Sequence, residues 1–230
     1  MRTCLLILFA SMLAACDTNF SAKRDLPVSA ATDVAPEQYR AEFENDWVKI
    51  IRVKYAPGES SEMHSHNRMI GIHLTAMSSL YTDADGVVEK RDAAAFIPFE
   101  TSDDDIHAQE NLLASATESV LIELKASYQP TIAESPNGFD SNPNSRQLLL
   151  GGEGYRVFKT TYKKGMQMPL HSHNAKVAVF VTDAHFLTET LEGGGSEQMI
   201  AAGQARWGDE TSHKVSNLGE AFEVLVVELL

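Results

Sequence analysis

The sequence contains very little cysteine. Only Cys4 and Cys16 are present, and both lie within the first sixteen of 230 residues. A domain formed by the remainder of the chain therefore has neither a thiol nor a disulfide bond, even where its compartment permits disulfides. Thiol catalysis and zinc–thiolate sites are excluded for that domain.

Positive charge is also scarce. The chain has 19 lysine and arginine residues against 32 aspartate and glutamate residues, which gives a formal net charge of −13 at pH 7. A surface this acidic repels the phosphate backbone of nucleic acids and the headgroups of anionic lipids. We therefore exclude nucleic acid as a partner, and we expect no basic patch to hold the protein at a membrane.

The N-terminal apolar run is short. Arg2 supplies a positive charge, residues 5–12 form an apolar core, and small residues follow at Ala14 and Ala15. This order is typical of a secretory signal, and the run is too short to span a bilayer as a permanent helix.

Residues 13–16, Leu-Ala-Ala-Cys, resemble the lipobox of bacterial lipoproteins. The resemblance implies that residues 1–16 are a lipoprotein signal and that acylated Cys16 becomes the mature N-terminus. An ordinary signal peptide with an incidental cysteine is the alternative. The expected location is the bacterial cell envelope, facing the periplasm, with the lipid as the only membrane attachment.

Two polar, proline-containing stretches divide the remaining chain. Residues 17–38 lack hydrophobic periodicity and predict a flexible tether, and residues 127–146 predict a linker between domains. Segments 39–126 and 147–230 alternate short β-branched and apolar runs with turn signals. That pattern predicts an all-β protein with two sandwich or barrel domains.

The two β segments are copies of one another. A shift of 107 residues places Gly58 on Gly165, and shifts of 105 to 107 align the rest of the two segments. This correspondence predicts a tandem duplication. Six of the eight histidines occupy matched positions, namely His64, His66 and His107 in the first copy and His171, His173 and His213 in the second.

The matched histidines predict two metal sites. Residues i and i+2 of a strand project from the same face, so each His-Ser-His places two imidazoles side by side. A third imidazole from another strand, about forty residues later, completes a face of three nitrogens. Such a face suits Fe(II), Mn, Ni, Cu or Zn and leaves positions for water or substrate. The alternative is that the imidazoles merely line a barrel without metal.

Each half resembles a cupin, a small β-barrel family with a two-part metal motif. The first part is a glycine, five residues and His-x-His, and Gly58 and Gly165 stand at that spacing. The second part ends in His-x-x-x-Asn, which matches residues 107–111 and 213–217. The resemblance implies a bicupin, with two double-stranded β-helix (jelly-roll) barrels packed as an intramolecular pseudo-dimer.

The sequence departs from the cupin motif where that motif carries a glutamate ligand. Four and five residues after His-x-His stand Ile70 and Gly71 in the first half, and Val177 and Ala178 in the second. The chain therefore resembles the three-histidine cupins, which include iron-dependent thiol and diketone dioxygenases, and oxalate chemistry is not expected. The stretch before His213 is more regular than the stretch before His107, so we expect the second triad to hold metal more tightly.

Two classes of function remain open at this point. One is a metal-dependent oxygenase or lyase acting on an unidentified small molecule in the envelope. The other is a non-catalytic lipoprotein that binds or senses a small molecule. No acid, base or nucleophile stands at a motif-defined position, so no catalytic residue besides the ligands is predicted. Fold resemblance does not choose between the two classes.

The lipobox gives the first testable prediction. A Cys16→Ala change should abolish incorporation of labelled fatty acid and leave the precursor unprocessed, because the acylated thiol is missing. Cys4→Ala is the matched control, since Cys4 is removed with the signal, and it should be labelled and processed normally. A Cys16→Ala protein that reaches the membrane with unchanged mobility would contradict the lipoprotein assignment.

Overall fold

The computed structural model describes residues 29–102, 105–125, 128–129 and 143–230. The predicted signal, Cys16 and residues 17–28 of the predicted tether lie outside these ranges, so the lipid anchor stays a prediction. Almost all regular structure in the described residues is β-strand, as the sequence predicts. None of the helices found there is long and apolar enough to cross a membrane.

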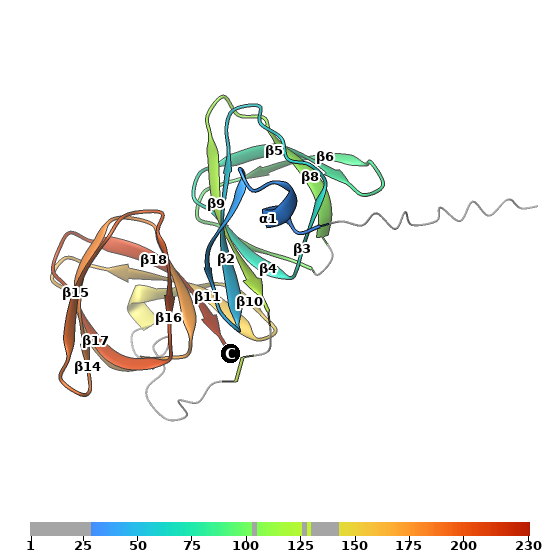
Figure 1. Ribbon diagram of the computed structural model, residues 1–230. Helices are drawn as coiled ribbons and strands as arrows, with labels where there is room; N and C mark the ends of the chain where they lie inside the picture. The colour runs from blue at the N-terminus through green and yellow to red at the C-terminus, as the bar shows by residue number, and fades with distance from the viewer. Residues whose placement is uncertain (1–28, 103–104, 126–127, 130–142) are drawn as a thin grey trace, which may run out of the picture.

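The first half forms two antiparallel sheets that face each other (Figure 1). One sheet has five strands in the order β1-β2-β9-β4-β7, and the other has four in the order β3-β8-β5-β6. The strands are β1 (Tyr39–Glu44), β2 (Val48–Tyr55), β3 (His64–His66), β4 (Met69–His73), β5 (Met77–Asp83), β6 (Val88–Ala93), β7 (Pro98–Thr101), β8 (Asp105–Asn111) and β9 (Thr117–Leu124).

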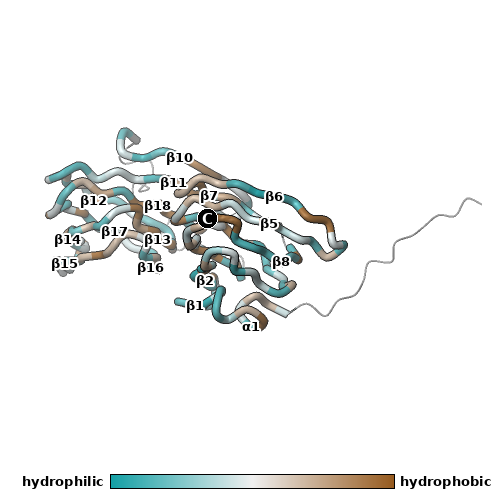
Figure 2. Tube along the Cα trace, turned by 90° about the horizontal axis from the view of Figure 1, so that it is seen from above, coloured by the Kyte–Doolittle hydropathy of each residue, from teal (hydrophilic) through white to brown (hydrophobic). Residues whose placement is uncertain are grey.

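The second half repeats this topology strand for strand. Its five-stranded sheet has the order β10-β11-β18-β13-β16, and its four-stranded sheet has the order β12-β17-β14-β15. The strands are β10 (Arg146–Gly152), β11 (Tyr155–Tyr162), β12 (Gln167–His173), β13 (Lys176–Phe180), β14 (Ala184–Thr190), β15 (Gly195–Ile200), β16 (Ala205–Gly208), β17 (Thr211–Asn217) and β18 (Phe222–Leu229). Figure 2 shows the two barrels side by side.

The central strands of both five-stranded sheets are buried on both faces. On β2 and β9, Ile51 and Leu121 point into the first barrel, whereas Ile50 and Ile122 point out of it and join residues of the second half. A strand buried on both faces needs consecutive apolar residues, which these strands have at their centres, Ile50-Ile51 in β2 and Val120-Leu121-Ile122 in β9. We call the joint group the shared cluster; its buried members are Val48, Ile50, Ile70, Ile72, Val120, Ile122, Tyr128, Tyr155, Val157, Ala175, Val177, Val179, Leu225, Val227 and Leu229.

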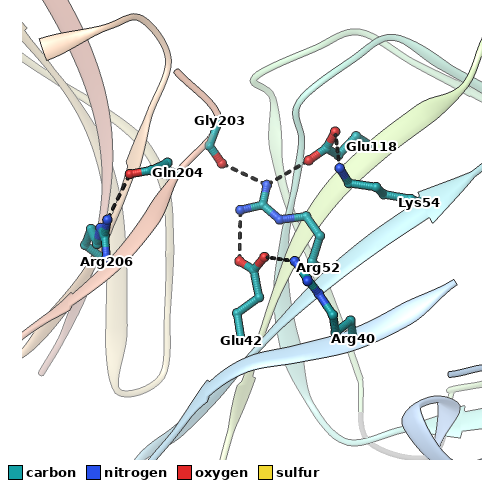
Figure 3. Close-up of polar contacts among 8 residues, drawn as sticks. All are labelled: Arg40, Glu42, Arg52, Lys54, Glu118, Gly203, Gln204 and Arg206. Atoms are coloured by element: carbon teal, nitrogen blue, oxygen red, sulfur yellow. Dashed lines mark hydrogen bonds and ion pairs between the residues drawn. The ribbon is translucent and has the colours of Figure 1, made fainter. Parts of the chain in front are cut away.

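Polar contacts of Arg52 also link the two halves. Arg52 projects from β2 with only 8% of its side chain exposed, and Figure 3 shows its guanidinium between the two barrels. Its Nη1 atom donates to the carbonyl oxygen of Gly203 at 2.8 Å and to Glu118 at 3.1 Å, and Nη2 donates to Glu42 at 2.9 Å. The guanidinium therefore has two carboxylate partners in the first half and a backbone partner in the second.

Parts of the predicted tether and linker are packed onto the barrels. The short helix α1 (Ala31–Val34) lies in the predicted tether, and Ala31 and Ala35 are buried in the first barrel's core. In the predicted linker, Tyr128 belongs to the shared cluster, and its hydroxyl accepts from the backbone N–H of Ala175 at 3.2 Å. The 3₁₀ helix η1 (Pro143–Ser145) leads into β10. A few small apolar and aromatic side chains in these stretches are buried. The polar composition of the stretches as a whole did not predict this burial.

Packing in the shared cluster gives the second prediction. Ile122→Ala should lower the free energy of unfolding by about 2 to 5 kcal/mol, because it leaves a cavity between two closely packed sheets. Ile97→Ala is the control, since Ile97 is 58% exposed, and it should cost about 0.5 kcal/mol or less. Urea denaturation measures both, and equal effects of the two changes would show that the sheets do not pack as described.

Candidate metal centres

The glycine of each motif shapes a turn rather than touching a ligand. Gly58 and Gly165 both have φ of +69°, a left-handed conformation that glycine adopts without steric cost. Each glycine lies between the strand that ends at a tyrosine, Tyr55 or Tyr162, and the strand that carries His-x-His. The glycine therefore fixes the path by which the chain reaches the histidines.

The asparagine that ends each motif holds the same turn. The Nδ2 atom of Asn111 donates to the carbonyl oxygens of Ala56 and Ser115 at 3.0 and 2.9 Å. Asn217 makes the equivalent contacts in the second half, at 3.0 and 2.9 Å. Both amides are buried, and a buried amide whose hydrogen bonds are made locks the loops that it joins. The asparagines are structural, which the motif alone does not reveal.

The structure brings each predicted set of three histidines together. On neighbouring antiparallel strands, His64 is paired with His107 and His171 with His213. The second imidazole of each His-x-His projects from the same face, as the strand period predicts. In both triads the candidate ligand atoms lie within 4.8 Å of one another. The geometry is available in both halves, and metal ligation itself stays a prediction.

A backbone hydrogen bond orients one imidazole in each triad for ligation. The Nδ1 atoms of His64 and His171 lie 2.7 Å from the carbonyl oxygens of Glu62 and Pro169. A carbonyl oxygen only accepts, so Nδ1 carries the proton and Nε2 keeps a lone pair. Within the described residues, both Nε2 atoms are buried and have no hydrogen-bond partner. A buried acceptor without a partner is costly, and a metal ion bound to it would remove that cost.

A buried carboxylate faces the second imidazole of each His-x-His. Glu123 Oε1 lies 3.9 Å from Nδ1 of His66, and Glu228 Oε1 lies 3.6 Å from Nδ1 of His173. These distances exceed a direct hydrogen bond, and neither Nδ1 atom has a hydrogen-bond partner among the described residues, so each carboxylate places a negative charge beside an imidazole without holding it. Both glutamates come from the closing strands, β9 and β18. In the sequence, the only feature that could have pointed to these glutamates is that a Glu-Leu pair ends the closing strand of both copies.

Burial favours the neutral form of His64, His66, His171, His173 and His213. It lowers the pKa of His64 to about 3 and the pKa of His213 to about 2. It also lowers the pKa values of His66, His171 and His173. Only a neutral imidazole has a lone pair for a metal ion, so the burial of these side chains favours the protonation state that ligation requires.

Comparison with known proteins gives the fold. No family profile and no curated protein matches the sequence, but many solved structures do. AerE from Microcystis aeruginosa matches with a TM-score of 0.59 and 15% identity over 84% of this chain and 97% of its own. A cupin 2 conserved barrel domain protein from Leptotrichia buccalis matches with a TM-score of 0.53 and 10% identity, over 84% and 88%. The chain has a bicupin fold.

An enzyme is also among the structures that are similar in fold. A variant of oxalate decarboxylase from Bacillus subtilis matches with a TM-score of 0.57 and 13% identity, over 80% of this chain and 69% of its own. At such identities the likeness shows the fold alone. The predicted architecture of two tandem cupin barrels is confirmed, and the reaction has to be argued from the site.

In both cupin barrels, the strand that follows His-x-His offers no ligand at the positions where the cupin motif has a glutamate. Ile70 and Val177, four residues after His-x-His, belong to the shared cluster and point away from the triads. Gly71, one residue further on, faces Phe99, and a Cβ atom at Gly71 would lie 2.0 Å from that ring. Phe99 therefore fills the space that a side chain at position 71 would need. The geometry supports three histidines without a fourth ligand from this strand.

The surroundings of the two triads differ. In the first barrel, Asp105 Oδ2 lies 3.3 Å from Nδ1 of His107, and this contact lowers the pKa of Asp105. A cavity of about 660 Å³ adjoins the first triad, and Tyr39, Met69 and Tyr81 are among its lining residues. The first triad therefore has an ionised carboxylate beside it and room for a small molecule.

The cavity in the second barrel is smaller, and basic side chains line it. Its cavity measures about 100 Å³, and Arg146, Lys176, His173 and His213 contribute to its lining. Burial lowers the pKa of Lys176 to about 8 and also lowers that of Arg146. Motif spacing did not predict these cations, because Arg146 precedes the motif and Lys176 stands at a position to which the cupin pattern assigns no role.

The two remaining histidines have ordinary partners. His73 Nδ1 lies 2.9 Å from the hydroxyl of Ser119, and His185 Nε2 lies 2.7 Å from Glu197. Neither belongs to a group of candidate metal ligands among the residues that the structure describes. Neither has a counterpart in the other half of the sequence, which also sets them apart from the triads.

The lowered histidine pKa values give the third prediction, for metal-free protein. Below pH 6.5 the unfolded chain protonates its histidines while folded His64 stays neutral down to about pH 3. Stability contributed by His64 is therefore present above pH 6.5 and is lost as the pH falls towards 3, by up to about 1.4 kcal/mol per pH unit. Urea titrations between these limits should give a shallower dependence for His64→Asn than for wild type.

His185→Asn is the control, because one third of the His185 side chain is exposed and it lies outside both triads. It should leave the pH dependence of unfolding close to that of wild type. A His64→Asn protein whose stability falls with pH as steeply as that of wild type would contradict the buried, neutral state of His64.

Proposed function

We propose that the chain is an envelope-tethered, metal-binding bicupin whose first barrel is a metal-dependent oxygenase or lyase site for a small molecule. The observation that carries the proposal is the junction of a buried three-histidine face with the large cavity in one barrel. The tether is the lipid on Cys16. Among small-molecule sites, a preformed cavity with a few convergent polar groups is the usual arrangement.

His64, His66 and His107 would hold a divalent metal ion, with Fe, Mn, Ni, Cu and Zn compatible with imidazole ligands. When bound, the ion supplies a Lewis acid with positions open to oxygen or a substrate atom. The protein's own part is to bury His64 and His66, which keeps them neutral, and to orient His64 through the carbonyl of Glu62. Asp105 adds negative charge beside His107 and favours a cation there.

The lining of the first cavity indicates a neutral and largely apolar substrate. Aromatic and methionine side chains, including Tyr39, Tyr81, Phe99 and Met77, form much of its wall. The charges at its edge compensate one another, since Glu89 pairs with Arg91 and Lys90 pairs with Asp92. Asp105 lies next to the triad and repels a carboxylate substrate. A volume of about 660 Å³ is within the usual range for small organic ligands.

The second triad, His171, His173 and His213, is a weaker metal site in this proposal. Two cations, Arg146 and Lys176, line the same cavity and raise the cost of adding a divalent cation. The sequence predicted the opposite, a tighter metal site in the second triad, because the segment before His213 is the more regular one. We also propose that the barrels act as an intramolecular pseudo-dimer, which the shared cluster and the Arg52 contacts support.

Metal content tests the proposed function and is the fourth prediction. Protein purified from its native envelope is compared with variants that carry three His→Ala changes in the first triad, in the second triad, or in both. Elemental analysis should show a larger loss of bound metal for the variant of the first triad than for the variant of the second, because the surroundings of the first triad are the more negative. The His73→Ala, His185→Ala double variant is the control and should keep the metal content of wild type.

Two outcomes would contradict the proposal. If wild type holds no stoichiometric first-row metal, even after anaerobic loading with Fe(II), the histidines line a barrel that binds a small molecule without metal, and the binding or sensor function becomes the better account. If only the variant of the second triad loses metal, the site lies in the other barrel. Oxygen uptake with a panel of neutral phenolic and aliphatic compounds then separates catalysis from binding.

A further inference from the structure

The two triads have the same backbone but differ at two corresponding positions. Arg146 is the first residue of β10 and Tyr39 is the first residue of β1, its counterpart in the first half. Lys176 is the first residue of β13, and Met69 begins the corresponding strand β4. Both substitutions replace an uncharged side chain by a cation beside the second triad. Two such changes around one small cavity alter what the cavity can hold.

The charge of Lys176 is only partly compensated within the protein. The buried carboxylate of Glu228 acts on Lys176 through space, but it already accepts from Arg156 Nε at 2.7 Å and from the backbone N–H of Asn174 at 3.2 Å. The Lys176 ammonium makes no hydrogen bond or ion pair with any residue that the structure describes. Asp209 acts on it through space, but Asp209 is exposed and accepts from the indole of Trp207. Lys176 is partly buried, and the cost of an ammonium without a direct counter-ion rises with its burial.

The cavity beside Lys176 is built for a small group. Thr160 and Tyr162 are polar side chains of its wall, and Phe180, Phe186 and Phe222 form an apolar side. Its volume is about 100 Å³, roughly that of three water molecules at about 30 Å³ each, which suits a molecule of a few covalently bonded heavy atoms. An anion with a short apolar tail matches both the cations and the phenylalanines.

We propose that the second barrel binds a small carboxylate, of the size of formate or acetate, between Lys176 and Arg146. The carboxylate oxygens would accept charge-assisted hydrogen bonds from the two cations, and any methyl group would lie against the phenylalanine side. The site is separate from the first cavity and does not require metal in either triad. The second barrel thereby has a ligand of its own rather than a copy of the first site.

Acetate titrated into the full-length protein in a chloride-free buffer tests this site, as the fifth prediction. Isothermal calorimetry should show one acetate per chain, and Lys176→Met, which gives the second barrel the side chain found at Met69, should weaken binding by about tenfold or more. Lys164→Met is the matched control, because it removes the same charge from a side chain that is 70% exposed. It should bind acetate like wild type.

Further variants separate a bound carboxylate from a purely structural role of Lys176. Lys176→Arg keeps the charge and should retain binding, and acetate should raise the melting temperature of wild type but not that of Lys176→Met, which is measurable even if that variant folds less stably. The variant with His64, His66 and His107 all changed to alanine should still bind acetate, whatever its metal content.

The proposal would be overturned by no acetate binding by wild type, by equal binding of neutral acetamide, or by wild-type affinity in Lys176→Met. Binding of inorganic phosphate in place of acetate would also overturn it, because it would assign the site to another class of anion.

Discussion

Burial of the five-stranded sheets on both faces is the constraint on which the rest of the structure depends. The inner face of each sheet closes a barrel, and the outer face packs against the other barrel through the shared cluster. Because β2, β9, β11 and β18 serve both purposes, their apolar side chains cannot be exchanged for polar ones on either face. The chemistry is thereby confined to the four-stranded sheets and to the ends of strands, where the triads lie.

Within that constraint the two barrels have kept one arrangement and changed its surroundings. Each triad has the same pairing of histidines across two strands, the same carbonyl contact to Nδ1 and the same glutamate from the closing strand. What differs is charge and volume, with Asp105 and a large cavity on one side and Lys176, Arg146 and a small cavity on the other. The two halves therefore share the histidine geometry and differ in the electrostatics of the space around it.

The barrel fold and both histidine triads were predictable from the sequence. Other residues near the triads were not, and both results have physical reasons. The period of two along a strand and the repeated spacing locate both triads, and the turn glycines and closing strands identify the barrel. The carboxylates Glu123 and Glu228 were not predicted as site residues, because their approach to His66 and His173 depends on how distant strands pair. The cations at positions 146 and 176 carry no motif, and only the folded barrel places them beside the second triad. Helix α1 was missed because a segment of four residues is too short to show helical periodicity.

The central claim is that the first triad, rather than the second, is the principal metal site of this bicupin. Anomalous X-ray diffraction at the absorption edge of the metal found in native protein tests it most directly, because it locates the ion. The account predicts the strongest anomalous peak at about 2.1 Å from imidazole nitrogens of His64, His66 and His107, with a weaker peak or none in the second barrel. A dominant peak among His171, His173 and His213, or no peak in either barrel, would contradict it.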